Sequence, residues 1–111
     1  MIELIVRKFL SKELKVPCYF EHKKDLPESY VMIEKTGAGG SDYTHSATLA
    51  FQSYAPSLQK AAELNEVVKQ AVENLITIDE VCGVHHNSDY NFTDTETKKY
   101  RYQAVYDINY F

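Results

Sequence analysis

The spacing of apolar and polar residues predicts two amphipathic helices. Near the start of the chain, apolar residues recur at intervals of three and four, as on a helix with one buried side; they are Ile2, Ile5, Val6 and Phe9. This helix ends before Pro17, because proline cannot continue a helix and restricts the residue before it. A stronger pattern begins at Pro56 and Ser57, which suit a helix start. It runs to about Asn74, with a stripe of Leu58, Ala61, Leu64, Val68, Ala71, Val72 and Leu75.

Five other segments have the composition or alternation of strands. Residues 17–21 and 30–35 are short runs rich in aromatic and β-branched side chains. From 45 to 52, apolar and polar residues alternate with a period of two, which predicts a longer strand with one face inward. A short strand is expected at 81–86, and the clearest alternation lies in 100–110.

The resulting order, α-β-β-β-α-β-β, predicts an α+β fold with a mainly antiparallel sheet and both helices packed on one face. At 111 residues, with 44% apolar and 25% charged residues, the chain has the size and composition of one globular domain spanning 1–111.

Two polar segments are expected to connect strands. Residues 36–42 contain three of the four glycines and predict a flexible loop or an extended hairpin. In the loop interpretation, 37–42 is disordered in the free subunit. The segment lacks the lysine and the following helix of a phosphate-binding loop. Residues 87–97 form the other connection.

The net charge and the lengths of the apolar runs argue against nucleic-acid and membrane partners. The net charge of −4 gives no overall basic field for phosphates, so specific nucleic-acid binding is not expected. No apolar run approaches the roughly 20 residues that span a bilayer. Charged residues interrupt the start of the chain, where a signal peptide needs an apolar stretch. We therefore expect a cytoplasmic protein without a membrane partner.

Cofactor and catalytic motifs are not evident in the sequence. Cys18 and Cys82 belong to no CxxC pair, which favours free thiols. His85 and His86 lie near Asp89, but neighbouring strand residues point to opposite faces, which disfavours a shared metal ion. The acids Asp89, Asp94 and Glu96 lack the EF-hand spacing. No metal, cofactor or enzymatic activity is expected.

Aromatic residues are the unusual feature, with nine tyrosines and no tryptophan. Tyr90 and Phe92 stand in a polar segment, where they either anchor a partner or fold back on their own domain. Tyrosines on one face of the last strand line either a subunit contact or the core. The candidate assembly interface comprises Tyr90, Phe92, Asp94, Tyr100 and Tyr102.

Four segments carry a family resemblance: 53–57, 61–65, 87–94 and 98–104. Together they resemble the small tail-completion proteins, of the tail-terminator type, found in siphophages and prophages of Gram-positive bacteria. The resemblance extends from about Tyr30 to the end of the chain, and Tyr100 to Gln103 is its most distinctive part.

The resemblance implies a structural subunit that forms a ring, commonly a hexamer, to cap the tail tube and join it to the head. Its partners would be further copies of itself, tail-tube proteins and head-connector proteins. Its location would be the host bacterial cytoplasm during assembly and the virion tail afterwards. Alternatives are a neighbouring neck or minor tail component, a host protein-binding adaptor, and a metal-dependent accessory enzyme using His85, His86 and Asp89.

Overall fold

The computed structural model describes residues 1–40 and 44–111. Its elements follow the order α-β-β-β-α-β-β that the sequence predicts, with a short 3₁₀ helix added after the second α-helix. They are α1 (Ile2–Glu13), β1 (Cys18–Tyr19), β2 (Tyr30–Gly40), β3 (His45–Ala55), α2 (Leu58–Glu73), η1 (Asn74–Thr77), β4 (Val81–Asn91) and β5 (Tyr100–Tyr110). Among the described residues, no helix combines the length and the apolar character needed to cross a membrane.

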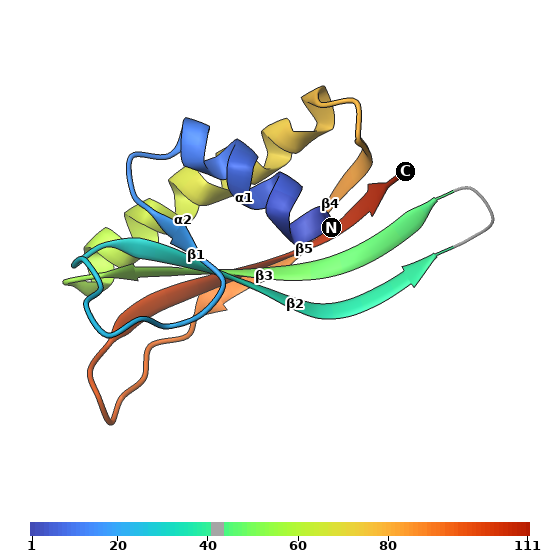
Figure 1. Cartoon of the computed structure of the whole chain (residues 1–111). Helices are drawn as coiled ribbons and strands as arrows, with labels where there is room; N and C mark the ends of the chain where they lie inside the picture. The colour runs from blue at the N-terminus through green and yellow to red at the C-terminus, as the bar shows by residue number, and fades with distance from the viewer. Residues whose placement is uncertain (41–43) are drawn as a thin grey trace.

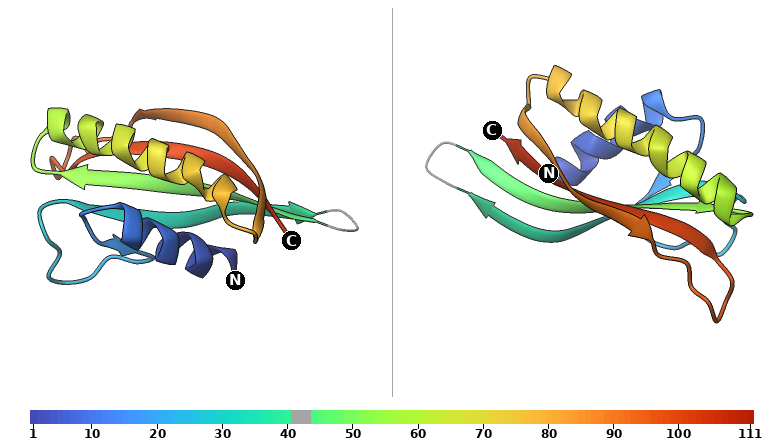
Figure 2. Two further views of the ribbon diagram at one scale, coloured as in Figure 1. Left: turned by 90° about the horizontal axis from the view of Figure 1, so that it is seen from above. Right: turned by 180° about the vertical axis from the view of Figure 1, so that it is seen from behind.

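The five strands form one sheet in the order β1-β2-β3-β5-β4. The short β1 pairs with β2 in parallel, and the other neighbours are antiparallel. Both helices lie on one face of this sheet, as predicted (Figure 1, Figure 2). β4 forms one edge of the sheet, and β1 covers only a small part of β2 at the other edge.

The main core lies between the sheet and the two helices. Val6 and Leu10 of α1 and Val68 of α2 are fully buried there, together with Phe51 of β3 and Tyr106 of β5. Helix α2 begins as the sequence predicts, because the Ser57 side chain accepts a hydrogen bond from the Lys60 amide at 3.2 Å. The apolar stripes of the two helices therefore meet the same side of the sheet.

A second, smaller cluster lies on the opposite face of the sheet, which we call the outer face. Tyr30, Met32 and Tyr54 are buried there, and Leu26 of the loop before β2 packs against them. The rings of Tyr30 and Tyr54 stack with centroids 4.5 Å apart and planes 12° apart. The loop between β1 and β2 thus covers one end of a face that neither α1 nor α2 covers (Figure 1).

Three sequence predictions need correction. Residues 87–91 belong to β4 rather than to a connection, because β5 pairs with their backbone. Residues 37–40 belong to β2 and pair with β3, which contradicts a disordered loop for this part; the rest of that prediction, 41–42, lies outside the described residues. In the α2 stripe, Leu58 is exposed, whereas the polar Asn65 is buried.

Candidate assembly interface

A bulge in β4 decides which of its side chains reach each face of the sheet. Its register against β5 shifts between His86 and Ser88, so Asn87 is an extra residue on this strand. His86 and Asp89 consequently both lie on the helix side, although they are three residues apart. Tyr90 follows Asp89 and lies on the outer face.

Tyr90 and Phe92 form an exposed aromatic pair on the outer face. Their rings meet edge to face with centroids 5.8 Å apart, and they are 42% and 40% exposed. We call these two residues, with Arg101, Gln103 and Tyr54 beneath and beside them, the outer-face patch. The patch brings together side chains from β3, β4 and β5 and from the residue that follows β4.

Arg101 holds one side of the outer-face patch in place. Its Nε donates a hydrogen bond to the Phe92 carbonyl at 2.6 Å, and its Nη1 donates one to the Tyr54 hydroxyl at 2.8 Å. The guanidinium also lies 4.4 Å from the centroid of the Phe92 ring. Arginine stacks well on aromatic faces, so this cation fixes the position of the exposed ring.

Two glutamines hold the other side of the patch. Gln52 Nε2 donates to Gln103 Oε1 at 2.9 Å, and Gln103 Nε2 donates to the Tyr90 hydroxyl at 2.6 Å. The Tyr54 hydroxyl donates to Gln52 Oε1 at 3.4 Å, which closes the connection back to Arg101. The polar atoms around the two rings therefore have partners, and the ring surfaces remain accessible.

Asp94 organises the turn between β4 and β5. Its Oδ1 accepts hydrogen bonds from the Glu96 amide at 3.0 Å and the Thr97 amide at 3.4 Å. Hydrogen bonds from the Thr97 side chain and from these amides lower the pKa of the Asp94 carboxyl. The geometry gives Asp94 a local role in the turn.

Tyr100 and Tyr102 lie on the helix side of β5, away from Tyr90 and Phe92. Both alternate in phase with Tyr106, which is fully buried under α2. The two tyrosines are half-buried. The structure therefore divides the five predicted interface residues between two faces and a turn, and brings only Tyr90 and Phe92 into contact with one another.

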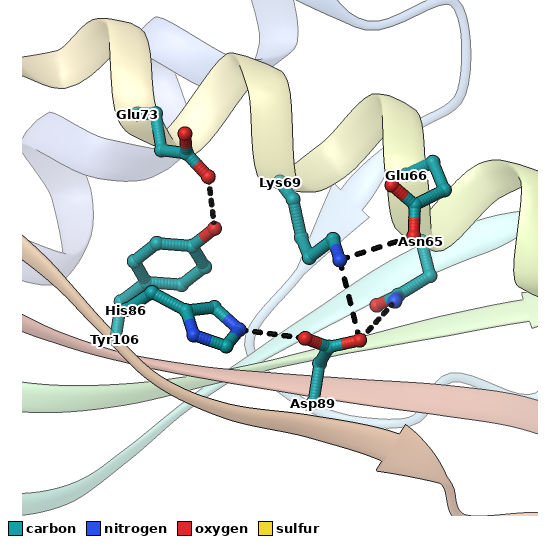
Figure 3. Close-up of polar contacts among 7 residues, drawn as sticks. All are labelled: Asn65, Glu66, Lys69, Glu73, His86, Asp89 and Tyr106. Atoms are coloured by element: carbon teal, nitrogen blue, oxygen red, sulfur yellow. Dashed lines mark hydrogen bonds and ion pairs between the residues drawn. The ribbon is translucent and has the colours of Figure 1, made fainter.

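A polar cluster joins β4 to α2 on the helix side (Figure 3). Asp89 accepts hydrogen bonds from Lys69 Nζ at 3.3 Å and Asn65 Nδ2 at 3.4 Å, and another links it to His86 Nε2 at 2.6 Å. Lys69 also pairs with Glu66 at 3.0 Å. These contacts attach the helix to the edge strand.

The same cluster shifts the ionisation of its members. Burial favours the neutral form of Asp89, but hydrogen bonds from His86 and Lys69, with the Lys69 charge, outweigh it and lower the pKa of this carboxyl. The hydrogen bond to Glu66 is the main cause that raises the pKa of Lys69. Burial, and then the 2.6 Å hydrogen bond to Glu73, raise the pKa of the Tyr106 hydroxyl.

The residues of the metal hypothesis do not converge. His85 is paired with Asp107 in the β4–β5 register, and His86 is paired with Tyr106, so the two imidazoles lie on opposite faces. Only His86 contacts Asp89. Across residues 1–40 and 44–111, no group of three or more His, Cys, Asp or Glu side chains has the arrangement of a metal site.

Sequence reasoning missed Arg101 and the two glutamines as parts of the aromatic surface. Arg101 and Gln103 are recognisable as one face of the last strand, but the partners on β3 and β4 depend on sheet order. Asn65 and Lys69 were also missed as partners of Asp89. Their spacing of four places them on one side of a helix, which is a weak signal without knowledge of what that side faces.

A scan of the chain against models of known protein families gives no match, and neither does a comparison with curated proteins.

Proposed function

We propose that this protein is a structural subunit of a bacteriophage tail, at the tail-completion or tail-terminator position, that closes a ring at the end of the tail tube. The outer-face patch and the adjoining edge strand β4 form part of the contact between subunits. The observation that carries this proposal is the exposed pair Tyr90 and Phe92, held in fixed positions on an uncovered sheet face.

The outer-face patch has the properties of an interface anchor. Aromatic side chains contribute much of the energy of protein contacts when they enter a partner's pocket. Arg101 and Gln103 already restrict the positions of Phe92 and Tyr90, so binding costs little further side-chain entropy. The polar atoms around the rings already form hydrogen bonds within the subunit. A partner that covers the patch would therefore leave few polar atoms buried without a hydrogen bond, and the desolvation cost would be small.

The exposed edge of β4 supports the same conclusion. This strand has 11 residues and stands at the end of the strand order, so its outer side faces no further strand in the described part of the chain. Free backbone groups of an edge strand are a common site of strand addition. Tyr90 lies on this strand and Phe92 directly follows it, so the free edge and the aromatic pair form one surface.

The net charge of the subunit fits a ring through which DNA passes. Identical subunits joined head to tail either continue as a filament or close into a ring, and closure stops the growth of a tube. A subunit with net charge −4 repels phosphate, which suits a channel through which DNA passes without binding.

Deletion of the gene from its phage tests the proposed function. Electron microscopy of the lysate should show unjoined heads and tails of abnormal length, and a plasmid copy of the gene should restore normal particles. Normal infectious particles without the gene would overturn the proposal.

Complementation with variants tests the contact. The double variant Tyr90→Ala and Phe92→Ala should fold but restore far fewer infectious particles, because interface anchors carry much of the contact energy. Phe20→Ala is the matched control, since Phe20 is an exposed aromatic residue that lies outside the patch. Full complementation by the double variant would remove the patch from the interface.

A further inference from the structure

We propose that one subunit inserts an exposed ridge, residues 76–80, into a lysine-lined cavity at the other end of α2 in the next subunit. This inference rests on the proposed function, because it names a contact by which copies of this chain would associate. Two features support it. The ridge is acidic and carries an exposed apolar side chain, whereas the cavity is lined by lysines and apolar residues, and the two surfaces lie near opposite ends of α2.

The cavity has a volume of about 380 Å³ and is formed by three segments. The loop before β2 contributes Lys23 and Lys24 with the apolar Leu26 and Pro27. The turn before β5 contributes Lys98 and Lys99. The third segment is the end of β3 with the residue after it, which contributes Tyr54, Ala55 and Pro56, and the lining is completed by Tyr30 and Tyr100. Lysines therefore stand on two separate segments around a partly apolar pocket.

This cavity is basic in an acidic protein. It holds four of the 12 lysine and arginine residues of the chain, against Glu28 as the single acid among its described lining residues. Within residues 1–40 and 44–111, none of these four lysines forms an ion pair with a carboxylate. Helix α2 begins beside the cavity without an acid in its first turn, so its positive end adds to the field.

The ridge lies after the other end of α2 (Figure 1). Ile76 of η1 is 52% exposed, so about half of this aliphatic side chain is accessible to a partner. Asp79 and Glu80 follow it and are also exposed. The ridge is held in shape by the half-buried Ile78, whose amide donates to the Leu75 carbonyl at 3.1 Å. This segment therefore carries one exposed apolar side chain and two exposed carboxylates.

The positions of the two surfaces favour a head-to-tail contact. Helix α2 has 16 residues, which corresponds to a length of about 24 Å. The helix begins shortly after Pro56, which lines the cavity, and its last residues lead into the ridge. One surface at each end lets every subunit donate a ridge and accept another, which is the arrangement that a ring requires.

An acidic peptide segment fits the cavity better than a phosphate group. Lysines are flexible point charges and lack the forked geometry with which arginine binds phosphate. The apolar lining also needs a side chain to cover it, and Ile76 supplies one. A second copy carries both features in one segment.

Two charge-reversed variants of the full chain test the contact. The acceptor variant is Lys98→Glu with Lys99→Glu, and the donor variant is Asp79→Lys with Glu80→Lys. Self-association is measured by sedimentation velocity from micromolar to millimolar protein, with thermal unfolding as the check on folding. Each variant alone should associate about a hundredfold or more weakly than the unaltered chain, because like charges then face each other.

Mixing the two variants gives the sharpest result. The acceptor variant keeps its native ridge and the donor variant keeps its native cavity, so one native contact remains between them. The reversed ridge and the reversed cavity also carry opposite charges, so the mixture should regain most of the association that each variant loses alone, and high salt should weaken it again. The neutral variants Lys98→Gln with Lys99→Gln and Asp79→Asn with Glu80→Gln should show smaller losses, and they preserve the test if a reversed variant misfolds.

Several outcomes would overturn this inference. A mixture that stays monomeric, an unaltered chain that stays monomeric throughout, or variants that assemble as the unaltered chain does would each do so. So would a cavity that binds a single-stranded oligonucleotide but not a second copy. Gene deletion tests the phage function separately, so a failure here with abnormal tails there would reject this contact alone.

Discussion

The two faces of β4 differ in whether their polar groups are covered by another element. On the helix side, Asp89 is bound by His86 and by two side chains of α2, and the helix covers the group. On the outer face, Gln103 binds the Tyr90 hydroxyl, but the ring stays exposed. The difference shows that polar groups on one strand can attach a helix to one face and fix the position of an exposed aromatic ring on the other.

Coverage by α2 is the physical cause of that difference. Helix α2 places Val68 and Val72 over the sheet and brings Lys69 to the edge strand. Within residues 1–40 and 44–111, no helix covers the outer face, where the loop before β2 shields Tyr30, Met32 and Tyr54. The helix side therefore contains the main core, whereas Tyr90 and Phe92 on the outer face remain exposed.

The largest expected effect comes from breaking the helix side at Val68, which is fully buried. Val68→Asp places a charge without a partner in the core and should lower the free energy of unfolding by about 4 kcal/mol or more, enough to unfold the domain. Val67→Asp is the matched control, because Val67 precedes it on α2 and is 51% exposed. The control should change stability by less than about 0.5 kcal/mol. Thermal unfolding of both variants measures this, and equal losses would show that the buried side of α2 is misassigned.

A smaller effect is expected from Asp89→Asn, which tests whether the helix-side cluster stabilises the fold. The pKa of Asp89 is lowered in the folded protein from 3.8. Its stabilising contribution is therefore present above pH 3.8 and is lost as the pH falls through the lower folded value. The variant should lose about 1–2 kcal/mol at neutral pH and show a flatter decline in acid.

Urea unfolding between pH 7 and pH 2 measures this dependence. Asp25→Asn serves as the control, because Asp25 is exposed and has no hydrogen bond or ion pair among the described residues. Parallel stability curves for the unaltered chain and Asp89→Asn would show that the Asp89 cluster adds nothing to folding.

The smallest effect concerns the turn that connects β4 and β5. Lys98 has a φ of +54°, a left-handed backbone conformation that costs most residues energy and suits glycine. Lys98→Gly should raise the free energy of unfolding by about 0.5–1 kcal/mol. Lys99→Gly should lower it instead, since Lys99 is extended and forms a bridge with Asp94. Chemical denaturation distinguishes the two, and the same sign of change in both would contradict this account of the turn.

Local patterns in the sequence predicted most elements. The spacing of Val68, Ala71 and Val72 predicted the buried side of α2, and alternation predicted β5. The second half of β4 was missed because 87–91 has the composition of a polar connection, and its strand conformation depends on pairing with β5. The burial of Asn65 was missed for a related reason, since Asp89 reaches it from a different part of the chain.

For the candidate interface, the sequence singled out Tyr90 and Phe92 as large aromatic groups in a polar segment. It could not separate them from Tyr100 and Tyr102, because composition does not say which face of a sheet a residue occupies. In β4, the bulge at Asn87 determines that Tyr90 lies on the outer face. The cavity lysines are likewise distant in sequence, and only the fold brings Lys23 and Lys98 around one pocket.

The sequence by itself determined the two helices, the last strand and the order of elements, because helical and strand periods are properties of neighbouring residues. Tertiary structure alone decided the strand order, the helix-side cluster and the outer-face patch. Each of these depends on contacts between residues far apart in the chain, such as Gln52 with Gln103 and Lys69 with Asp89. Such contacts are set by the register of paired strands and by the face on which a helix packs, and neither is encoded in the period of any single segment.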